Sequence, residues 1–262
     1  MLPPVDLDRY PLHLPESAAC KALVAQCKAD LARDGMFNLE GFMLPEAIAR
    51  TVAETSPRLN AQEAFTHARR HNIYFKPMPD LPAGHPALKE VETRNYTLCA
   101  DQCEGTPVDD IYSWQPLADF LARTMDHDAL YPMPDPLARF NVMGYPEGWG
   151  LNWHFDRSQF TTTLLLQAPL EGGEFIYRSE LRTDDDPNYD GVAKLLNGDD
   201  PEVKSFRAEA GTLNVFKGKN TAHRVAPVIG QVPRIVTVFT YYDRPGVMFS
   251  KEERMGFYGR EA

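Results

Sequence analysis

Residues 151–167, with the sequence LNWHFDRSQFTTTLLLQ, set the expected fold class. The second half, 160–166, is rich in Thr and Leu and predicts a strand. Glycines at 172–173, 211, 218 and 230 mark turns around further candidates. These further strand candidates lie at 137–145, 174–177, 212–216, 221–228 and 234–242. Short strands with turns at roughly 8–12-residue spacing are typical of a sandwich or barrel, so we expect a mainly β fold.

The sequence before residue 137 has a different character. Apolar residues at helical spacing predict helices over 17–33, 45–55 and 115–125, the first capped by Ser17. We expect residues 17–130 to be mainly helix and loop, packed on the outside of the sheet. Residues 183–201 are rich in Asp and predict a polar excursion. The expected organisation is one domain with three parts: a helical and loop part (1–136), a β core (137–243) and a C-terminal tail (244–262).

The charge and the apolar content of the chain limit the kinds of molecule that it is expected to bind. The 262 residues include 27 Lys and Arg against 37 Asp and Glu, a formal net charge of −10. An acidic chain without a long basic run is a poor candidate for binding nucleic acid or an anionic membrane, so we expect a small-molecule substrate. No apolar run approaches the roughly 18 residues of a membrane helix, and residues 1–16 do not resemble a secretory signal. We therefore expect a cytoplasmic protein with reduced cysteines; the sequence leaves its oligomeric state open.

The pattern that carries chemistry is Trp153-His154-Phe155-Asp156. On an extended backbone, His154 and Asp156 point to the same face, where an imidazole nitrogen and a carboxylate oxygen can both bind a divalent ion. His223 is the candidate third ligand. Two histidines and one carboxylate are typical of non-haem Fe(II) oxygenases. The alternative is a buried histidine that is hydrogen-bonded to a neighbouring aspartate, because His-x-Asp alone is a weak motif.

Arg234 is the fourth residue of interest. If 221–228 and 234–242 form a hairpin centred between Val228 and Ile229, Arg234 lies opposite His223 and on the same face. A guanidinium in that position can hold a carboxylate with two hydrogen bonds. The expected geometry therefore suits a dicarboxylate that reaches from the metal to the arginine. The alternative is a surface arginine on an edge strand.

Taken in order, these motifs closely resemble the Fe(II)/2-oxoglutarate-dependent oxygenases. The resemblance covers about residues 137–243, and the N-terminal part is similar only at 70–74 (RHNIY), with 258–260 (YGR) at the other end. These two short motifs are similar to the subgroup of free-amino-acid hydroxylases and halogenases. The motifs that carry the main resemblance are RFNVMGY (139–145), WHFDRS (153–158), TTLLLQ (162–167), EGGEF (171–175), GTL (211–213), HRV (223–225) and Arg234.

The resemblance implies a double-stranded β-helix, which is a jelly-roll barrel of the cupin-like kind. It implies that Fe(II) is bound by His154, Asp156 and His223, that Arg234 binds the distal carboxylate of 2-oxoglutarate, and that O₂ is consumed. The family often has Ser or Thr two residues after this arginine, but Val236 stands there, so the second partner of the carboxylate is open. Weaker candidates for contacts to the co-substrate are Asn141 and Thr163.

The resemblance also bears on the reaction. Related halogenases have Gly or Ala where Asp156 stands, and chloride takes the vacancy, so we expect hydroxylation of an unactivated C–H bond rather than halogenation. The expected substrate is small and polar, a free amino acid or a derivative. Candidate substrate contacts are Arg157, Arg70, His71 and Asn72, although the basic stretch around 67–72 would also suit a solvated helix face. Desaturation or cyclisation, a non-redox cupin-like metalloenzyme, and a binding module without turnover stay open.

Overall fold

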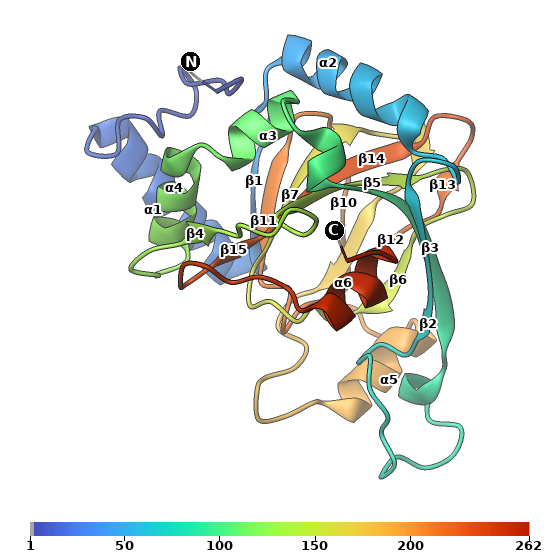
Figure 1. Ribbon diagram of the computed structural model, residues 1–262. Coiled ribbons are helices and arrows are strands. Elements are labelled where there is room, and N and C mark those ends of the chain that lie inside the picture. The colour runs from blue at the N-terminus through green and yellow to red at the C-terminus, as the bar shows by residue number, and fades with distance from the viewer. Residues whose placement is uncertain (1–2, 262) are drawn as a thin grey trace.

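A computed structural model describes residues 3–261 and contains two facing β-sheets with helices on the outside (Figure 1). The helices are α1 (Ala18–Asp34), α2 (Pro45–Thr55), α3 (Pro107–Tyr112), α4 (Gln115–Thr124), α5 (Tyr189–Asn197) and α6 (Lys251–Tyr258), with short 3₁₀ turns at Ser56–Arg58, Pro86–Leu88 and Ala100–Cys103. The strands are β1 (Met36–Leu39), β2 (Phe65–His71), β3 (Val91–Cys99), β4 (Tyr131–Pro132), β5 (Phe140–Tyr145), β6 (Leu151–His154), β7 (Thr161–Gln167), β8 (Glu171–Gly172), β9 (Phe175–Arg178), β10 (Lys204–Phe206), β11 (Leu213–Phe216), β12 (Ala222–Val225), β13 (Val228–Ile229), β14 (Arg234–Phe239) and β15 (Tyr241–Tyr242).

The larger sheet has seven strands in the order β1-β11-β7-β14-β5-β3-β2, and the smaller has four in the order β10-β9-β12-β6. Every strand pair in both sheets is antiparallel. Neighbouring strands are mostly distant in the sequence, because the chain crosses repeatedly from one sheet to the other. The expected mainly β fold with a jelly-roll core is confirmed.

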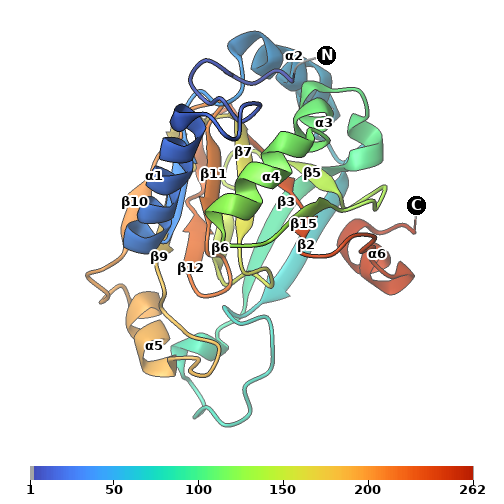
Figure 2. The ribbon, with the colours of Figure 1, turned by 90° about the vertical axis from the view of Figure 1, so that its left-hand side faces the viewer.

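The three predicted helices are confirmed, and they lie in the layer outside the sheets. The Ser17 hydroxyl accepts a hydrogen bond from the Cys20 N–H (3.2 Å) at the start of α1, and Gly35 (φ 74°) ends the helix in the left-handed region. Figure 2 shows α1 and α4 lying across one face of the large sheet, where their apolar side chains form one buried cluster with those of β7, β11 and β14. None of the helices within residues 3–261 has both the length and the apolar character needed to cross a bilayer.

The expectation that residues 17–130 are mainly helix and loop is wrong for three strands. Strand β1 pairs with β11, and β3 and β2 extend the large sheet beyond β5. The edge strand β2 has polar residues on both faces, so it lacks the alternation of apolar and polar residues that signals a strand. The polar excursion at 183–201 also contains a helix, α5, whose N-cap is Asn188.

The expected hairpin between 221–228 and 234–242 is also wrong. Strand β12 belongs to the small sheet and β14 to the large one, and β13 between them pairs with β8. Consequently His223 lies opposite His154 and Tyr177, while Arg234 lies opposite Tyr145. Prolines at 227 and 233 lack the N–H that a continuous ladder would need there, which favours the crossing between sheets.

Candidate metal centre

Three side chains converge between the two sheets. His154 ends β6, Asp156 follows in the next loop, and His223 lies in β12 directly opposite His154. One ligand atom from each residue lies within 4.8 Å of the other two. His154 Nε2 is 3.3 Å from Asp156 Oδ1, and His223 Nε2 is 3.5 Å from Asp156 Oδ2. These separations exceed the usual length of an N–H···O hydrogen bond, so they suit a shared ion better than a direct His–Asp pair.

Both imidazoles are oriented by backbone carbonyls. The Nδ1–H of His154 can donate to Asn152 O (2.8 Å), and that of His223 to Thr221 O (3.0 Å). This tautomer leaves the lone pair of each Nε2 free to bind an ion. Burial, and then the neighbouring His154, lowers the pKa of His223 to about 4, so this ring is neutral near pH 7.

The carboxylate of Asp156 is held from two sides. Thr161 donates its hydroxyl hydrogen to Asp156 Oδ2 (2.5 Å), and the Asp156 N–H donates to Gly218 O (3.0 Å). Burial alone would raise the pKa of Asp156, but the positive charge that His223 carries when it is protonated at low pH, the contact with His154 and the Thr161 hydrogen bond outweigh burial and hold the pKa well below its usual range. The group is therefore an ionised ligand.

The donor set fits a divalent iron ion. Two neutral nitrogens and one carboxylate on one side of an octahedron leave the opposite positions open for small molecules. The side chains of His154 and His223 are only 8% and 3% exposed, whereas that of Asp156 is 22% exposed. Asp156 is therefore the most accessible of the three ligands.

Arg234 lies on the large sheet, in the interior strand β14, and is 9% exposed. The alternative of a surface arginine on an edge strand is therefore wrong. Burial lowers its pKa, and within residues 3–261 its guanidinium makes no ion pair or hydrogen bond. Gly173 lies next to this arginine: a Cβ there would lie 3.4 Å from Arg234 Cδ, an ordinary contact distance, but only 2.6 Å from Pro169 Cγ, so it is Pro169 that requires the glycine. A buried cation without a partner indicates a site for an anion.

The two weaker co-substrate candidates differ. The amide of Asn141 donates to Leu137 O (2.8 Å) and accepts from the Tyr258 hydroxyl (2.9 Å), so it anchors α6. Thr163 lies half-buried in β7 between Asn214 and Val238, on the same face as Thr161. Thr163 therefore remains a candidate for contact with the co-substrate. The side-chain amide of Asn141 already makes hydrogen bonds to Leu137 and Tyr258.

The predicted substrate contacts are not all directed at the centre. Arg70 is 70% exposed and lies 3.6 Å from Glu90, and Arg157 is 78% exposed and lies 3.7 Å from Glu253. Alternation along β2 places Arg70 on the face opposite His71. These two arginines are therefore surface residues in this structure.

His71 and Asn72 lie nearer the metal ligands. The His71 ring is buried, contacts the Thr93 hydroxyl (2.9 Å) and stacks on Phe75 (4.2 Å between centroids). The Phe75 ring in turn meets His154 edge-on at 5.8 Å. Asn72 instead holds the following turn, because its side chain accepts from the Tyr74 N–H (3.0 Å).

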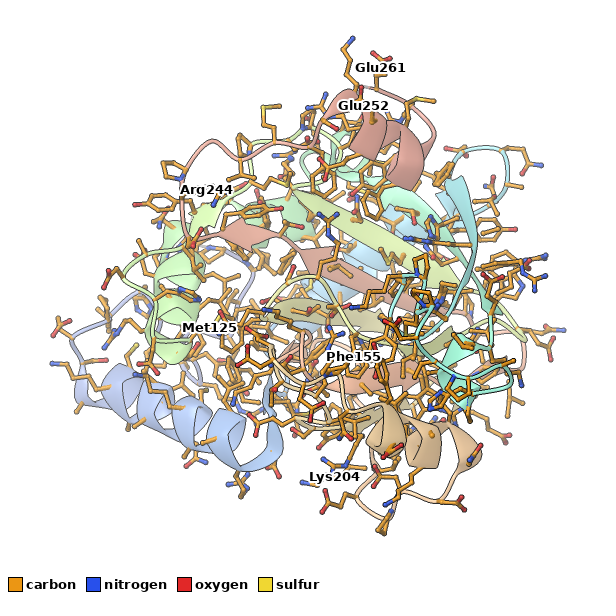
Figure 3. All side chains as sticks on the ribbon, turned by 90° about the horizontal axis from the view of Figure 1, so that it is seen from below. Met125, Phe155, Lys204, Arg244, Glu252 and Glu261 are labelled. Carbon is orange, nitrogen blue, oxygen red and sulfur yellow. The ribbon has the colours of Figure 1, made fainter. Side chains whose placement is uncertain are left out.

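Two further arginines lie over aromatic rings near the metal ligands: Arg69, which belongs to the basic stretch at 67–72, and Arg182, which the sequence reasoning missed. The guanidinium of Arg69 lies 4.7 Å above Phe75, and that of Arg182 lies 4.0 Å above Phe155, which is central in Figure 3. Arg182 is fixed by donation from Nε to Lys219 O (2.8 Å). Neither has an acidic partner within residues 3–261. Alternation from His71 distinguishes Arg69 from Arg70 within the basic stretch, but nothing local in the sequence marks Arg182.

The chain is similar to a known protein family and to several solved structures. The family model described as Halogenase D matches residues 20–250. The epimerase SnoN in complex with Fe³⁺, alpha ketoglutarate and nogalamycin RO is similar over 85% of this chain and 84% of its own (17% identity, TM-score 0.57). A 2OG-Fe(II) oxygenase family oxidoreductase from Burkholderia pseudomallei is similar over 86% and 92% (15%, 0.53). A prolyl-4-hydroxylase from Pseudomonas putida is similar over 84% and 99% (15%, 0.50).

The curated proteins include no significant match to this sequence. The solved structures share less than 25% of their residues with the chain, so they establish its fold, while the family model spans most of its length. The suspected family is confirmed: the chain belongs to the Fe(II)/2-oxoglutarate-dependent oxygenases, in the family described as Halogenase D.

Proposed function

We propose that the protein is a dioxygenase that uses Fe(II), 2-oxoglutarate and O₂ to hydroxylate a small polar substrate. The observation that carries this proposal is the cluster of His154, Asp156 and His223, whose ligand atoms lie within 4.8 Å of one another. Arg234 supports it as the buried cation for the distal carboxylate of 2-oxoglutarate. When bound, the iron and 2-oxoglutarate supply O₂-dependent oxidation of a C–H bond, with release of succinate and CO₂.

The protein's own residues hold the three metal ligands and orient them. The two imidazoles bind through Nε2 because backbone carbonyls engage their Nδ1 atoms. Thr161 keeps the Asp156 carboxylate in one orientation. The aromatic rings of Phe75 and His71 cover His154 and limit the access of water on that side.

Asp156 favours hydroxylation over halogenation. Its carboxylate occupies the ligand position that a halide would need, and Thr161 and Gly218 enclose it closely. Halogenation is the second candidate, and the description of the matching family model favours it. Mass spectrometry of the product in chloride-containing buffer distinguishes the two, because hydroxylation adds one oxygen atom and halogenation replaces hydrogen with chlorine.

The substrate that we propose carries an anionic group, as a free amino acid does. Arg69 and Arg182 support this, because both are stacked on aromatic rings near the metal ligands and lack acidic partners within residues 3–261. Such unpaired guanidiniums in an acidic chain can hold a carboxylate with two hydrogen bonds. Succinate release measured across free amino acids, each paired with its amide, tests this class.

An anaerobic titration tests the proposed activity. Adding Fe(II) and then 2-oxoglutarate should produce a weak visible charge-transfer band. A wild-type protein without this band would refute the oxygenase proposal. Persistence of the band in His223→Ala and Asp156→Ala would refute the ligand assignment while leaving the activity open to another site.

A further inference from the structure

Phe75 has a backbone conformation that phenylalanine rarely adopts. Its φ is 55°, in the left-handed region, where the Cβ of an L-residue crowds the following carbonyl oxygen. The other non-glycine residues with positive φ in the described part of the chain are Asp126, Glu180 and Asn188. Short polar side chains can compensate such strain with local hydrogen bonds, whereas a phenyl ring cannot. Strain of this kind persists only where neighbouring contacts impose it, and it concentrates at functional sites.

The side chain of Asn72 imposes this conformation. Its amide nitrogen donates to Lys76 O (2.7 Å), and its amide oxygen accepts from the Tyr74 N–H (3.0 Å). The backbone oxygen of Asn72 accepts from the Phe75 N–H (3.1 Å). These hydrogen bonds close a tight turn over residues 72–76. A glycine at position 75 would adopt the same φ without strain, so the turn by itself does not explain the phenyl ring.

The Phe75 ring is not part of the core. The nearby Ile73, Tyr74 and Met78 belong to a buried apolar cluster that includes residues of α5. Phe75 is half-buried and belongs to none of the buried apolar clusters within residues 3–261. The loop therefore buries its other apolar side chains against α5 and directs this ring elsewhere.

The ring lies between a metal ligand and an unpaired cation. It stacks on His71 with 21° between the planes, and it meets the His154 ring at 84° with 5.8 Å between centroids. The guanidinium carbon of Arg69 lies 4.7 Å from the centroid of the Phe75 ring. A substrate anion held by Arg69 would therefore have the Phe75 ring beside the chain of atoms that leads to the metal.

We propose that Phe75 determines which substrates the enzyme accepts, because its ring is the apolar wall beside the metal that limits the size of the group next to the oxidised carbon. This inference rests on the proposed function. A ring that is held by a strained turn and stacked on His71 yields little, so an added methyl group on the substrate would clash with it. Removing the ring should make room for a larger group.

The first test asks whether the ring serves the fold. For Phe75→Gly we expect an unfolding temperature within about 3 °C of wild type, because relief of the strain offsets the lost ring contacts. The matched control in the same loop is Met78→Ala, which removes a side chain from the buried cluster and should lower the unfolding temperature by about 5 °C or more. An equally large fall for Phe75→Gly would overturn the inference, because the ring would then be ordinary packing.

The second test measures the space beside the metal without substrate or 2-oxoglutarate. Co(II) in place of iron reports a new ligand through its visible absorbance, and the probes are imidazole and 4-phenylimidazole, which differ by one phenyl ring. In Phe75→Gly the half-saturating concentration of 4-phenylimidazole, relative to that of imidazole, should fall about tenfold or more, because the added ring can occupy the vacated space. Met78→Ala should keep the wild-type ratio within about twofold.

An unchanged ratio in Phe75→Gly would overturn the inference even if the variant is stable. Failure of the wild type to bind Co(II) at all would instead overturn the proposed metal centre. The two failures are therefore distinguishable in one titration.

The third test measures turnover. L-Leucine differs from L-norvaline by one methyl branch, and succinate release gives kcat/KM for each. The ratio of kcat/KM for leucine to that for norvaline should rise about tenfold or more in Phe75→Gly and stay at the wild-type value in Met78→Ala. Equal ratios in wild type and Phe75→Gly would overturn the inference. Absence of succinate release with either amino acid in both proteins would count against the proposed substrate class, and the Co(II) titration then decides the inference alone.

Discussion

Replacing Gly218 with alanine tests how tightly the metal-binding carboxylate is enclosed. A Cβ on residue 218 would lie 2.4 Å from Asp156 Oδ2, 2.6 Å from Thr161 Oγ1 and 2.9 Å from Asp156 Cβ. Ordinary contacts begin near 3.4 Å, so the carboxylate oxygen would have to retreat by about 1 Å. Rotation of the carboxylate alone does not relieve the clash, because the Asp156 Cβ is also too close.

A displacement of that size exceeds what a metal site tolerates. Ligand distances are held within about 0.2 Å, and disturbing the groups that orient a ligand costs roughly 10- to 100-fold in metal affinity. That range corresponds to about 1.4–2.7 kcal/mol. We expect Gly218→Ala to weaken Fe(II) binding by this factor, measured by anaerobic titration of Fe(II) at saturating 2-oxoglutarate while the visible band is followed.

Gly256→Ala is the matched control. Gly256 lies in α6, and a Cβ there would meet no atom within 4 Å. In a helix this substitution should stabilise the protein by roughly 0.5–1 kcal/mol and leave Fe(II) affinity unchanged. Wild-type Fe(II) affinity in Gly218→Ala, with an unchanged unfolding temperature, would show that the loop around Asp156 yields easily and that the reasoning is wrong.

Three further predictions concern other parts of the molecule. Thr161→Val removes the hydrogen bond to Asp156 and should lower Fe(II) affinity about tenfold in the same titration; an unchanged affinity would show that the bond does not orient the ligand. Asp135 is fully buried and accepts from three backbone N–H groups and an arginine, so Asp135→Asn should cost about 3 kcal/mol in urea unfolding near neutral pH. Burial alone would raise its pKa, but these bonds lower it below 3.8, so the stabilisation is complete above that value and the difference between wild type and variant should shrink as the pH falls below it. Arg69→Ala should raise the KM of the substrate found by succinate screening at least tenfold, as expected for a charge-assisted contact, and Arg70→Ala should not; equal effects would contradict the assignment by strand face.

The buried Asp135 and the helix α6 also explain why the C-terminal tail is ordered. Arg254 of α6 donates to Asp135 (3.0 Å), and Arg260 holds Asp101 through two hydrogen bonds (2.6 and 2.7 Å). Apart from the short motif at 258–260, local patterns predict only a tail over residues 244–262, because these partners lie more than a hundred residues away in the chain. In Figure 1, α6 lies in front of the space between the two sheets.

Local sequence patterns were sufficient for features that depend on near neighbours. The helices at α1, α2 and α4 follow from apolar spacing and end residues, and the shared face of His154 and Asp156 follows from their separation by one residue. The ordered motifs were enough to indicate the family. For the helices and for the His154–Asp156 pair, the deciding geometry is set within a few residues of backbone, so it is present in the linear order.

Tertiary structure decided which strands face one another. Only the fold placed His223 opposite His154 rather than Arg234, and Arg234 opposite Tyr145. It also placed Gly218 against Asp156, and it put the exposed Arg69 on the same strand face as His71, beside the Phe75 ring. The pairing of distant strands depends on how the whole chain buries its apolar faces. The alternation of residues along one strand does not indicate which other strand will pair with it.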